Sequence, residues 1–261
     1  MDWSKIKTIF ILTFLILDVY LLFQFMKIRD ANKYEIIAEA SIEEKLDADE
    51  ISYKELPKAP IKDQYLSAEP KMFTKDDITK LKGQTVNLKE PSATLQVKLD
   101  KPLQLNAKFE AAELTPFIKD HVLFGDEYHF WRKNDKKNTI IYFQHYENMT
   151  LYENLSGMII FQLDDKNQII SYEQTYLEDI EKMIERKELL PPLKALETLH
   201  QKGALKPKSK ITKVELGYST LIQLAASQAL APTWRFVVDD KESLYVNALE
   251  GQIIQFNSDG N

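Results

Sequence analysis

The sequence predicts an α+β fold of antiparallel sheets with packed helices, preceded by one long apolar helix. Three observations carry this prediction. Residues 6–26 are almost entirely apolar. Segments with the two-residue period of strands gather between residues 127 and 175, and again after residue 211. The helical segments stand between these blocks and do not alternate with single strands, which favours an α+β over an α/β fold.

The apolar segment predicts a transmembrane helix over residues 6–26, with residues 1–5 as a cytoplasmic tail. A bilayer core about 30 Å thick needs about 20 apolar residues, and residues 8–26 carry only one charge, Asp18. A buried helix of a soluble protein would have a polar face, which is missing here. A cleaved signal peptide is the stronger alternative, with Lys5 and Lys7 at its start and Ala38-Glu39-Ala40 as a cleavage site. The apolar run exceeds the roughly 7–15 residues of such a leader, which favours an uncleaved anchor.

Composition limits the classes of function. Basic residues flank the span on both sides, so their distribution gives little information on orientation. The short tail ahead of a long folded part instead predicts a cytoplasmic N-terminus and a large extracellular domain. Residues 1–33 carry a net charge of +2, so the other 228 carry −8. An acidic domain argues against nucleic-acid binding. The absence of cysteine excludes disulfides, thiolate catalysis and cysteine-based zinc sites.

The middle of the chain predicts a juxtamembrane helix over residues 27–48 and a first α+β subdomain over residues 49–106. Strands are expected at 50–56, 64–68 and 94–99. Between them, Thr74 and Asp77 form a predicted capping box at the start of a helix that Gly83 ends. A second helix is expected over residues 107–118.

A second, larger subdomain is predicted over residues 107–261. Four strand candidates lie at residues 127–133, 139–146, 157–163 and 169–175, and polar turns at 134–137 and 164–167 predict hairpins. A helix is expected over residues 190–202. The chain should close with a strand at 211–221 and a three-strand meander over residues 234–256, turning at 239–242 and 248–251.

Motifs for catalysis are missing or weak. The four histidines form no H-E-x-x-H motif, and His129 and His145 are expected to meet as a cross-strand pair rather than as a metal site. His200 is expected on a helix surface. The pairs Asp164-Asp165 and Asp239-Asp240 fall in predicted turns, where aspartate is favoured for local hydrogen bonds. With seven glycines there is no phosphate-binding loop. The sequence thus predicts no enzyme, no cofactor and no metal site.

Asp18 is the unusual residue of the span. A charged side chain near the bilayer centre costs about 2.5–3.5 kcal/mol on insertion scales. The apolar residues around it could simply tolerate that cost. Alternatively Asp18 meets a polar group of another transmembrane helix, where a hydrogen bond contributes roughly 0.6–2 kcal/mol. The second interpretation predicts a partner-binding surface made of Ile11, Leu15, Asp18, Leu22 and Phe25, with Thr13, Tyr20 and Gln24 along another face.

Three stretches carry a family resemblance. MDWSKIKTIFILTFLILDVYLLFQF resembles the N-terminus of the YycI (WalI) family of Gram-positive bacteria. PTWRF at 232–236 and YVNALEGQI at 245–253 are similar to the closing strands of that family. The second of these also resembles PepSY-type modules, which are small extracellular domains of a helix and a sheet.

The resemblance implies a non-enzymatic accessory protein of the WalRK (YycFG) two-component system, which controls cell-wall metabolism. In that family a single N-terminal helix spans the cell membrane and an α+β domain related to parts of YycH lies outside. The implied partners are YycH and the sensor histidine kinase WalK (YycG), contacted in part through transmembrane helices. No catalytic residue is implied.

Two other functions remain as alternatives. One is an anchored extracellular binding module of PepSY-like type, acting as a protease inhibitor or cell-wall chaperone without a kinase. The other is a membrane-tethered hydrolase, which would need a cleft where histidine and carboxylate groups converge.

Overall fold

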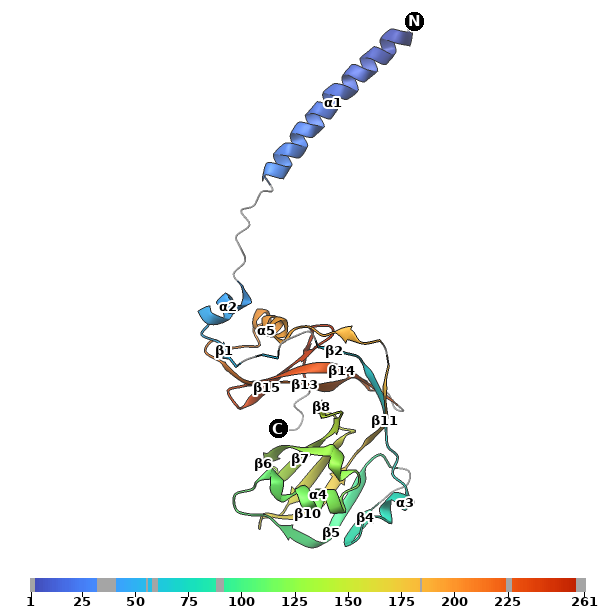
Figure 1. Cartoon of the computed structure of the whole chain (residues 1–261), viewed down its shortest axis with the longest axis vertical. Helices are drawn as coiled ribbons and strands as arrows, with labels where there is room; N and C mark the ends of the chain where they lie inside the picture. The colour runs from blue at the N-terminus through green and yellow to red at the C-terminus, as the bar shows by residue number, and fades with distance from the viewer. Residues whose placement is uncertain are drawn as a thin grey trace. The chain divides into compact units, whose positions relative to one another are not determined.

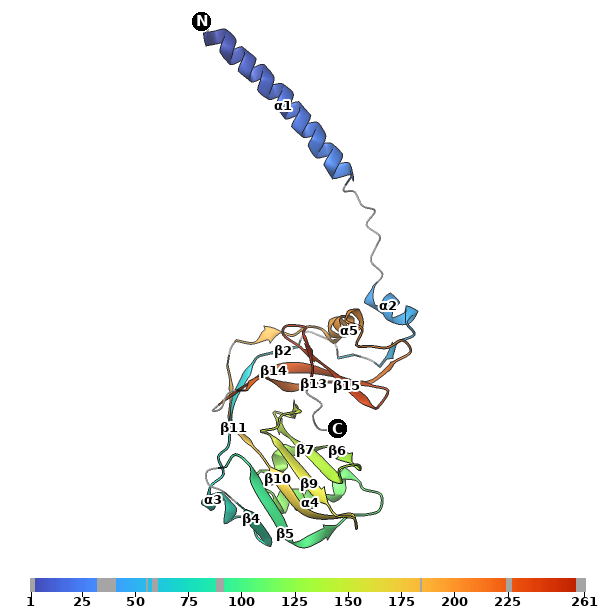
Figure 2. The same cartoon turned by 180° about the vertical axis from the view of Figure 1, so that it is seen from behind.

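The computed structural model describes residues 3–31, 41–54, 56–57, 61–87, 92–183, 185–223 and 227–256; within the first range, side chains are described for residues 3, 7–8 and 10–26. The chain divides into two compact units, residues 1–45 and residues 46–261. Figures 1 and 2 show the chain from opposite sides. The first unit holds one long helix, and all the strands belong to the second.

Helix α1 (Trp3–Ala31) dominates the first unit and is 29 residues long. It contains the whole segment 6–26, so the helical conformation predicted there is confirmed. Among the residues that the structure describes, no helix combines the length and apolar character that crossing a membrane requires. The anchor therefore stays a prediction.

The juxtamembrane helix predicted over residues 27–48 corresponds to two helical pieces. These are the end of α1 and helix α2 (Ile42–Ala48), while residues 32–40 lie outside the described residues. A capping box opens α2. The Ser41 N–H donates to the Glu44 carboxylate (3.0 Å), and the Glu44 N–H donates to the Ser41 hydroxyl (3.2 Å). This exchange pairs two N–H groups that have no partner inside the helix.

The second unit is built mainly of strands. They are β1 (Ser52–Tyr53), β2 (Lys62–Asp63), β3 (Leu66–Pro70), β4 (Gln84–Asn87), β5 (Leu95–Gln104), β6 (Tyr128–Asn134), β7 (Thr139–Tyr146), β8 (Met149–Tyr152), β9 (Met158–Leu163), β10 (Gln168–Gln174), β11 (Leu177–Lys182), β12 (Lys187–Glu188), β13 (Lys210–Gln223), β14 (Gln228–Val238), β15 (Glu242–Asn247) and β16 (Ile253–Ile254). Pairing joins fourteen of them in the order β11-β3-β14-β13-β8-β7-β9-β10-β5-β4, with β1, β6, β15 and β16 beside this path, and β2 pairs with β12. The predicted α+β class with a large, mainly antiparallel sheet is confirmed.

We call strands β4, β5, β6, β7, β9 and β10 sheet I. The four strands predicted between residues 127 and 175 are confirmed as β6, β7, β9 and β10, and their pairs are antiparallel. In β9, buried Ile159, Phe161 and Leu163 alternate with partly exposed residues, as the two-residue period requires. They pack in one core with Ile118 of helix α4 (Thr115–His121) and with Leu114, which precedes that helix.

We call strands β1, β3, β11, β13, β14, β15 and β16 sheet II. The predicted C-terminal meander is confirmed as β14, β15 and β16, which pair antiparallel. The predicted helix at residues 190–202 is α5 (Pro192–Gln201). Buried Trp234 donates its indole N–H to the Leu190 carbonyl (2.8 Å), so the meander is fastened to the segment that leads into α5.

The helix predicted over residues 107–118 is wrong. That stretch holds a short 3-10 helix, η1 (Ala111–Glu113), followed by α4. Pro116 was expected to disturb the end of a helix, but it lies in the first turn of α4, where its missing N–H has no cost. The capping box at Thr74 and Asp77 is confirmed, although its helix α3 (Lys75–Ile78) ends before Gly83.

Ladders cross the predicted division between residues 49–106 and 107–261. Strand β5 pairs with β10, and β3 pairs with both β11 and β14. Each ladder joins a strand from one side of residue 106 to a strand from the other. Residues 46–261 form one compact unit.

Strand β8 connects the two sheets. It pairs antiparallel with β7, where residue 145 faces 150 and residue 146 faces 149. It pairs parallel with β13, where residue 218 faces 151 and residue 219 faces 152. Gly217 makes this close approach possible. A Cβ atom at this position would lie 2.5 Å from the Thr150 carbonyl oxygen and 2.6 Å from the Tyr152 ring.

The side chain of Gln144 makes a second connection between the sheets. Its amide oxygen accepts the Leu177 N–H (2.8 Å) and its amide nitrogen donates to the Leu177 carbonyl (2.9 Å). Gln144 is fully buried, and it bonds to the backbone of Leu177, the first residue of β11, which also pairs with Pro70 of β3.

Replacing Gln144 with leucine should lower the free energy of unfolding by about 2–4 kcal/mol. The change leaves the N–H and the carbonyl of Leu177 without these partners, and each buried unpaired group costs about 1–3 kcal/mol. Urea unfolding measures the loss. Gln96→Leu is the control, because the exposed side chain of Gln96 donates to the exposed side chain of Glu173 (3.0 Å), and it should change stability by less than about 0.5 kcal/mol. Equal effects of the two variants would contradict the connecting role.

Candidate partner-binding surfaces

The five residues of the predicted partner-binding surface lie on α1 at positions 11, 15, 18, 22 and 25. Their spacing alternates between four and three residues, which keeps them on one face of a helix. The apolar members are exposed in this single chain: Ile11 by 67%, Leu15 by 59%, Leu22 by 62% and Phe25 by 64%. Asp18 is exposed at the centre of this row. We call the row the α1 stripe.

Three polar residues, Thr13, Tyr20 and Gln24, lie along the opposite side of α1 and are also exposed. Their spacing of seven and four residues again gives a single line along the helix. α1 therefore offers two different lines of contact, of which only the α1 stripe combines large apolar side chains with a carboxylate.

The histidines of the second unit make contacts within the fold. The structure confirms the predicted cross-strand pair, because the rings of His129 and His145 stack with centroids 3.7 Å apart. The Nε2 atom of His200 lies 2.7 Å from an Asp49 carboxylate oxygen, so it bonds within the fold at the surface of α5. In the described part of the chain, no group of three or more histidine and carboxylate side chains could hold a metal ion.

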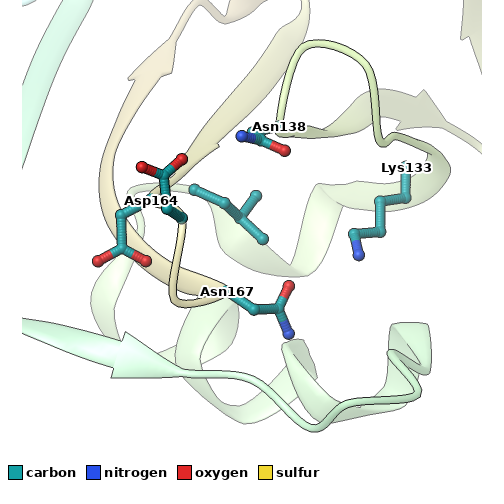
Figure 3. Close-up of a pocket in the computed structure, with 6 residues that line it drawn as sticks. Lys133, Asn138, Asp164 and Asn167 are labelled. Atoms are coloured by element: carbon teal, nitrogen blue, oxygen red, sulfur yellow. The ribbon is translucent and has the colours of Figure 1, made fainter.

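The paired aspartates act in turns, as predicted. One carboxylate oxygen of Asp164 accepts the N–H groups of Lys166 and Gln168, both at 2.9 Å. Figure 3 shows this turn at the edge of a cavity of about 300 Å³, which is lined by Lys133, Asn138, Leu163, Asp164, Asp165 and Asn167. Lys133 forms an ion pair with Asp135 (3.2 Å). The cavity is small and mostly polar.

A second cavity, of about 430 Å³, lies between α4 and strand β6. Its walls are mostly apolar, and an ion pair between Lys119 and Asp126 (3.4 Å) stands beside exposed His129. Apolar walls with a few polar groups suit a side chain or a small apolar group.

A charged cluster that the sequence did not predict lies where β13 and β14 face β6. The Arg235 guanidinium stacks 4.1 Å from the centre of the Trp131 ring and bonds to a Glu215 carboxylate oxygen at 2.8 Å. The side chain of Arg235 is 16% exposed and that of Glu215 is 32% exposed. The one signal in the sequence is an arginine within the otherwise apolar strand WRFVV. A largely buried, paired arginine of this kind holds its neighbouring strands in a fixed orientation.

The buried tyrosines remain protonated. Burial raises the pKa of Tyr245 to about 12, and burial also raises the pKa of Tyr128 and Tyr142 above the ordinary range. A hydroxyl with a raised pKa is a poor general base at neutral pH. The hydroxyls of Tyr128 and Tyr142 donate to the carbonyls of Thr175 and Ala111.

The chain was compared with curated protein sequences and with solved structures. No match to a curated protein sequence was found. Among solved structures, an uncharacterized protein from Eubacterium rectale ATCC 33656 aligns with a TM-score of 0.46 and 10% identity, over 80% of this chain and 91% of that chain. YycH from Bacillus subtilis aligns with a TM-score of 0.46 and 16% identity, over 76% of this chain and 54% of that chain. The Bacillus megaterium YpeB C-terminal domain aligns with a TM-score of 0.40 and 13% identity, over 73% and 90%.

A family comparison covers most of the chain. Residues 31–249 match the family model described as YycI protein. The match includes nearly all of the second unit and begins where α1 ends.

Proposed function

Because the chain belongs to the YycI family, whose members are regulatory accessory proteins, we propose that it is a membrane-anchored, non-enzymatic regulator of the sensor histidine kinase WalK (YycG). It acts in a complex with YycH and thereby controls cell-wall metabolism. The family match over residues 31–249 is the observation that carries this proposal. The contact with the kinase, the partner YycH and the extracellular position of the second unit are all part of what is proposed.

The proposed anchor is α1, with the N-terminus in the cytoplasm. Support comes from its length of 29 residues and from the large apolar side chains exposed along it between Phe10 and Met26. A helix with apolar side chains all round fits a lipid environment better than water. The family match begins at residue 31, so the role of α1 rests on its own side chains.

The α1 stripe is the proposed contact with transmembrane helices of the kinase complex. Its apolar members supply packing area, and Asp18 supplies a polar group that gains a partner only when another helix covers it. Such a hydrogen bond contributes roughly 0.6–2 kcal/mol, which is up to about thirtyfold in an association constant. A single carboxylate in an apolar row also fixes the register of the two helices.

The regulation follows from differential binding. A sensor kinase has active and inactive arrangements of its membrane helices. A helix that packs better on one arrangement shifts the population by the difference in the two binding free energies. A difference of 1.4 kcal/mol changes the ratio of the two states tenfold.

Photocrosslinking in membranes tests this function. The full chain carries a photoreactive amino acid at position 18 or 22, on the α1 stripe, or at position 20 on the opposite face, and is coexpressed with the kinase and YycH. We expect crosslinks to the kinase or YycH from positions 18 and 22, at several times the yield from position 20. Equal crosslinking yields from all three positions would refute the proposal that the α1 stripe is the contact surface. Capture of a cell-wall or secreted protein with no kinase or YycH would instead support an independent binding module.

A further inference from the structure

The stacked histidines stand at the point where the two sheets join. His129 pairs with Phe143 in the ladder of β6 and β7, and His145 follows two residues later on β7, at the end of that strand. The two imidazole rings stack at an angle of 20° with centroids 3.7 Å apart. His145 also pairs with Thr150 of β8, the strand that continues into sheet II.

The surroundings of His145 suit a neutral imidazole. Its Nε2 atom lies 2.9 Å from the Thr150 hydroxyl, and its Nδ1 atom is buried and has no hydrogen-bond partner in the described part of the chain. A neutral ring needs only one N–H group, whereas a protonated ring has two. The second N–H would be buried without an acceptor, which is costly for a charged group.

The charges that face His145 come from two neighbouring strands. His129 lies on β6, and Glu215 lies on β13. Glu215 is already bound by Arg235 (2.8 Å) and Lys213 (2.6 Å), so much of its negative charge is compensated. Burial, and then the neighbouring His129, lower the pKa of His145 to about 4, while Glu215 acts in the opposite direction.

We propose that the His129–His145 stack is a proton-sensitive joint that holds β8 between sheets I and II at neutral pH and releases it when the pH falls. The joint is weak enough to open, because only two residue pairs connect β8 to β7 and two connect it to β13. The stack is open to solvent on one side, because His129 is exposed and lines the 430 Å³ cavity. This proposal concerns the fold of residues 46–261 and does not depend on contact with a kinase.

The direction of the pH effect follows from linkage. His145 is neutral when β8 is paired, with a pKa of about 4, and regains the ordinary value of 6.5 when β8 opens. The open form therefore binds more protons between these two values, and stability is lost as the pH falls from 6.5 toward 4. These values predict that the equilibrium constant for opening rises about twentyfold between pH 7 and pH 5.

Hydrogen–deuterium exchange on the full chain in detergent micelles tests the joint. After correction for the intrinsic exchange rate, residues 149–152 of β8 should open about twentyfold more at pH 5 than at pH 7. Strand β5, which pairs on both sides inside sheet I, is the internal reference and should change less than about threefold. An equal change in both strands would overturn the proposal.

Two variants and one direct measurement separate the joint from general acid sensitivity. His145→Phe keeps an aromatic ring in the stack and should remove most of the extra opening of β8, whereas the control His121→Gln, at an exposed histidine on α4, should retain it. Full retention in His145→Phe would refute the joint. Should that variant not fold, the ring signals of His145 in the unmodified protein decide by NMR. Titration at an ordinary histidine pKa, about 6.5, would also refute it.

Discussion

Exchanging α1 for an unrelated apolar transmembrane helix should abolish control of the kinase while the second unit stays folded. The exchange keeps an apolar helix but removes the α1 stripe, and with it the differential packing that is proposed to shift the kinase between its states. The measurement is phosphorylation of the response regulator in reconstituted vesicles that contain the kinase and YycH. We expect the same rate with the exchanged protein as with no protein added.

A smaller change gives the matched control for this exchange. Asp18→Leu alone should weaken the association by about threefold to thirtyfold, because it removes the proposed hydrogen bond, worth roughly 0.6–2 kcal/mol. Gln24→Leu removes a polar group from the opposite side of the helix and should leave both association and control unchanged. Full control by the exchanged helix would show that the second unit acts without the α1 stripe.

Replacing Gly217 with alanine should destabilise the second unit by about 3 kcal/mol or more. The new Cβ atom would lie 2.5 Å from the Thr150 carbonyl oxygen, which is backbone and cannot rotate away. Overpacking of this kind costs about 1–3 kcal/mol and more where the backbone must shift. A loss of 3 kcal/mol corresponds to a fall in Tm of about 6–12 °C for a unit of this size. Thermal unfolding followed by circular dichroism measures it.

Gly83→Ala is the control that separates the cost of steric crowding from the cost of an unfavourable backbone conformation. Gly83 has a φ of +70° and no atom within 4 Å of an added Cβ. That variant should therefore cost only the left-handed conformation, about 1–2 kcal/mol. A Gly217→Ala protein as stable as Gly83→Ala would mean that β8 and β13 can separate freely, and that β8 is not a rigid link between the sheets.

Local pattern predicted the strands of sheet I and the C-terminal meander, because one-sided burial leaves a two-residue period in the sequence. It also predicted the contact between His129 and His145, which follows from two adjacent strands. The prediction of a helix over residues 107–118 was wrong because proline suits the first turn of a helix, so Pro116 marks where α4 begins and not where a helix ends. The five residues of the α1 stripe lie on one face of a helix as expected, and their binding role remains a prediction.

Long-range pairing is what the sequence could not reveal. The contact of Gln144 with Leu177 joins a side chain to the backbone of a distant strand, and no local period in the sequence records it. The same holds for the Arg235–Glu215 pair and for the ladder that joins β3 to β14. These contacts depend on how distant segments are brought together, so a boundary drawn from sequence order at residue 106 divides strands that pair.

The ladder between β3 and β14 also has a consequence for the order of folding. Strands β4 to β10 lie within residues 84–174 and pair among themselves, apart from β8. Sheet II needs Leu66 to meet Leu230, a far longer loop closure, which is entropically slower. A chain that emerges from its N-terminus can complete sheet I early, while β3 waits for almost the last strand. Pulse-labelling exchange during refolding should protect β9 and β10 before β3, and simultaneous protection would contradict this order.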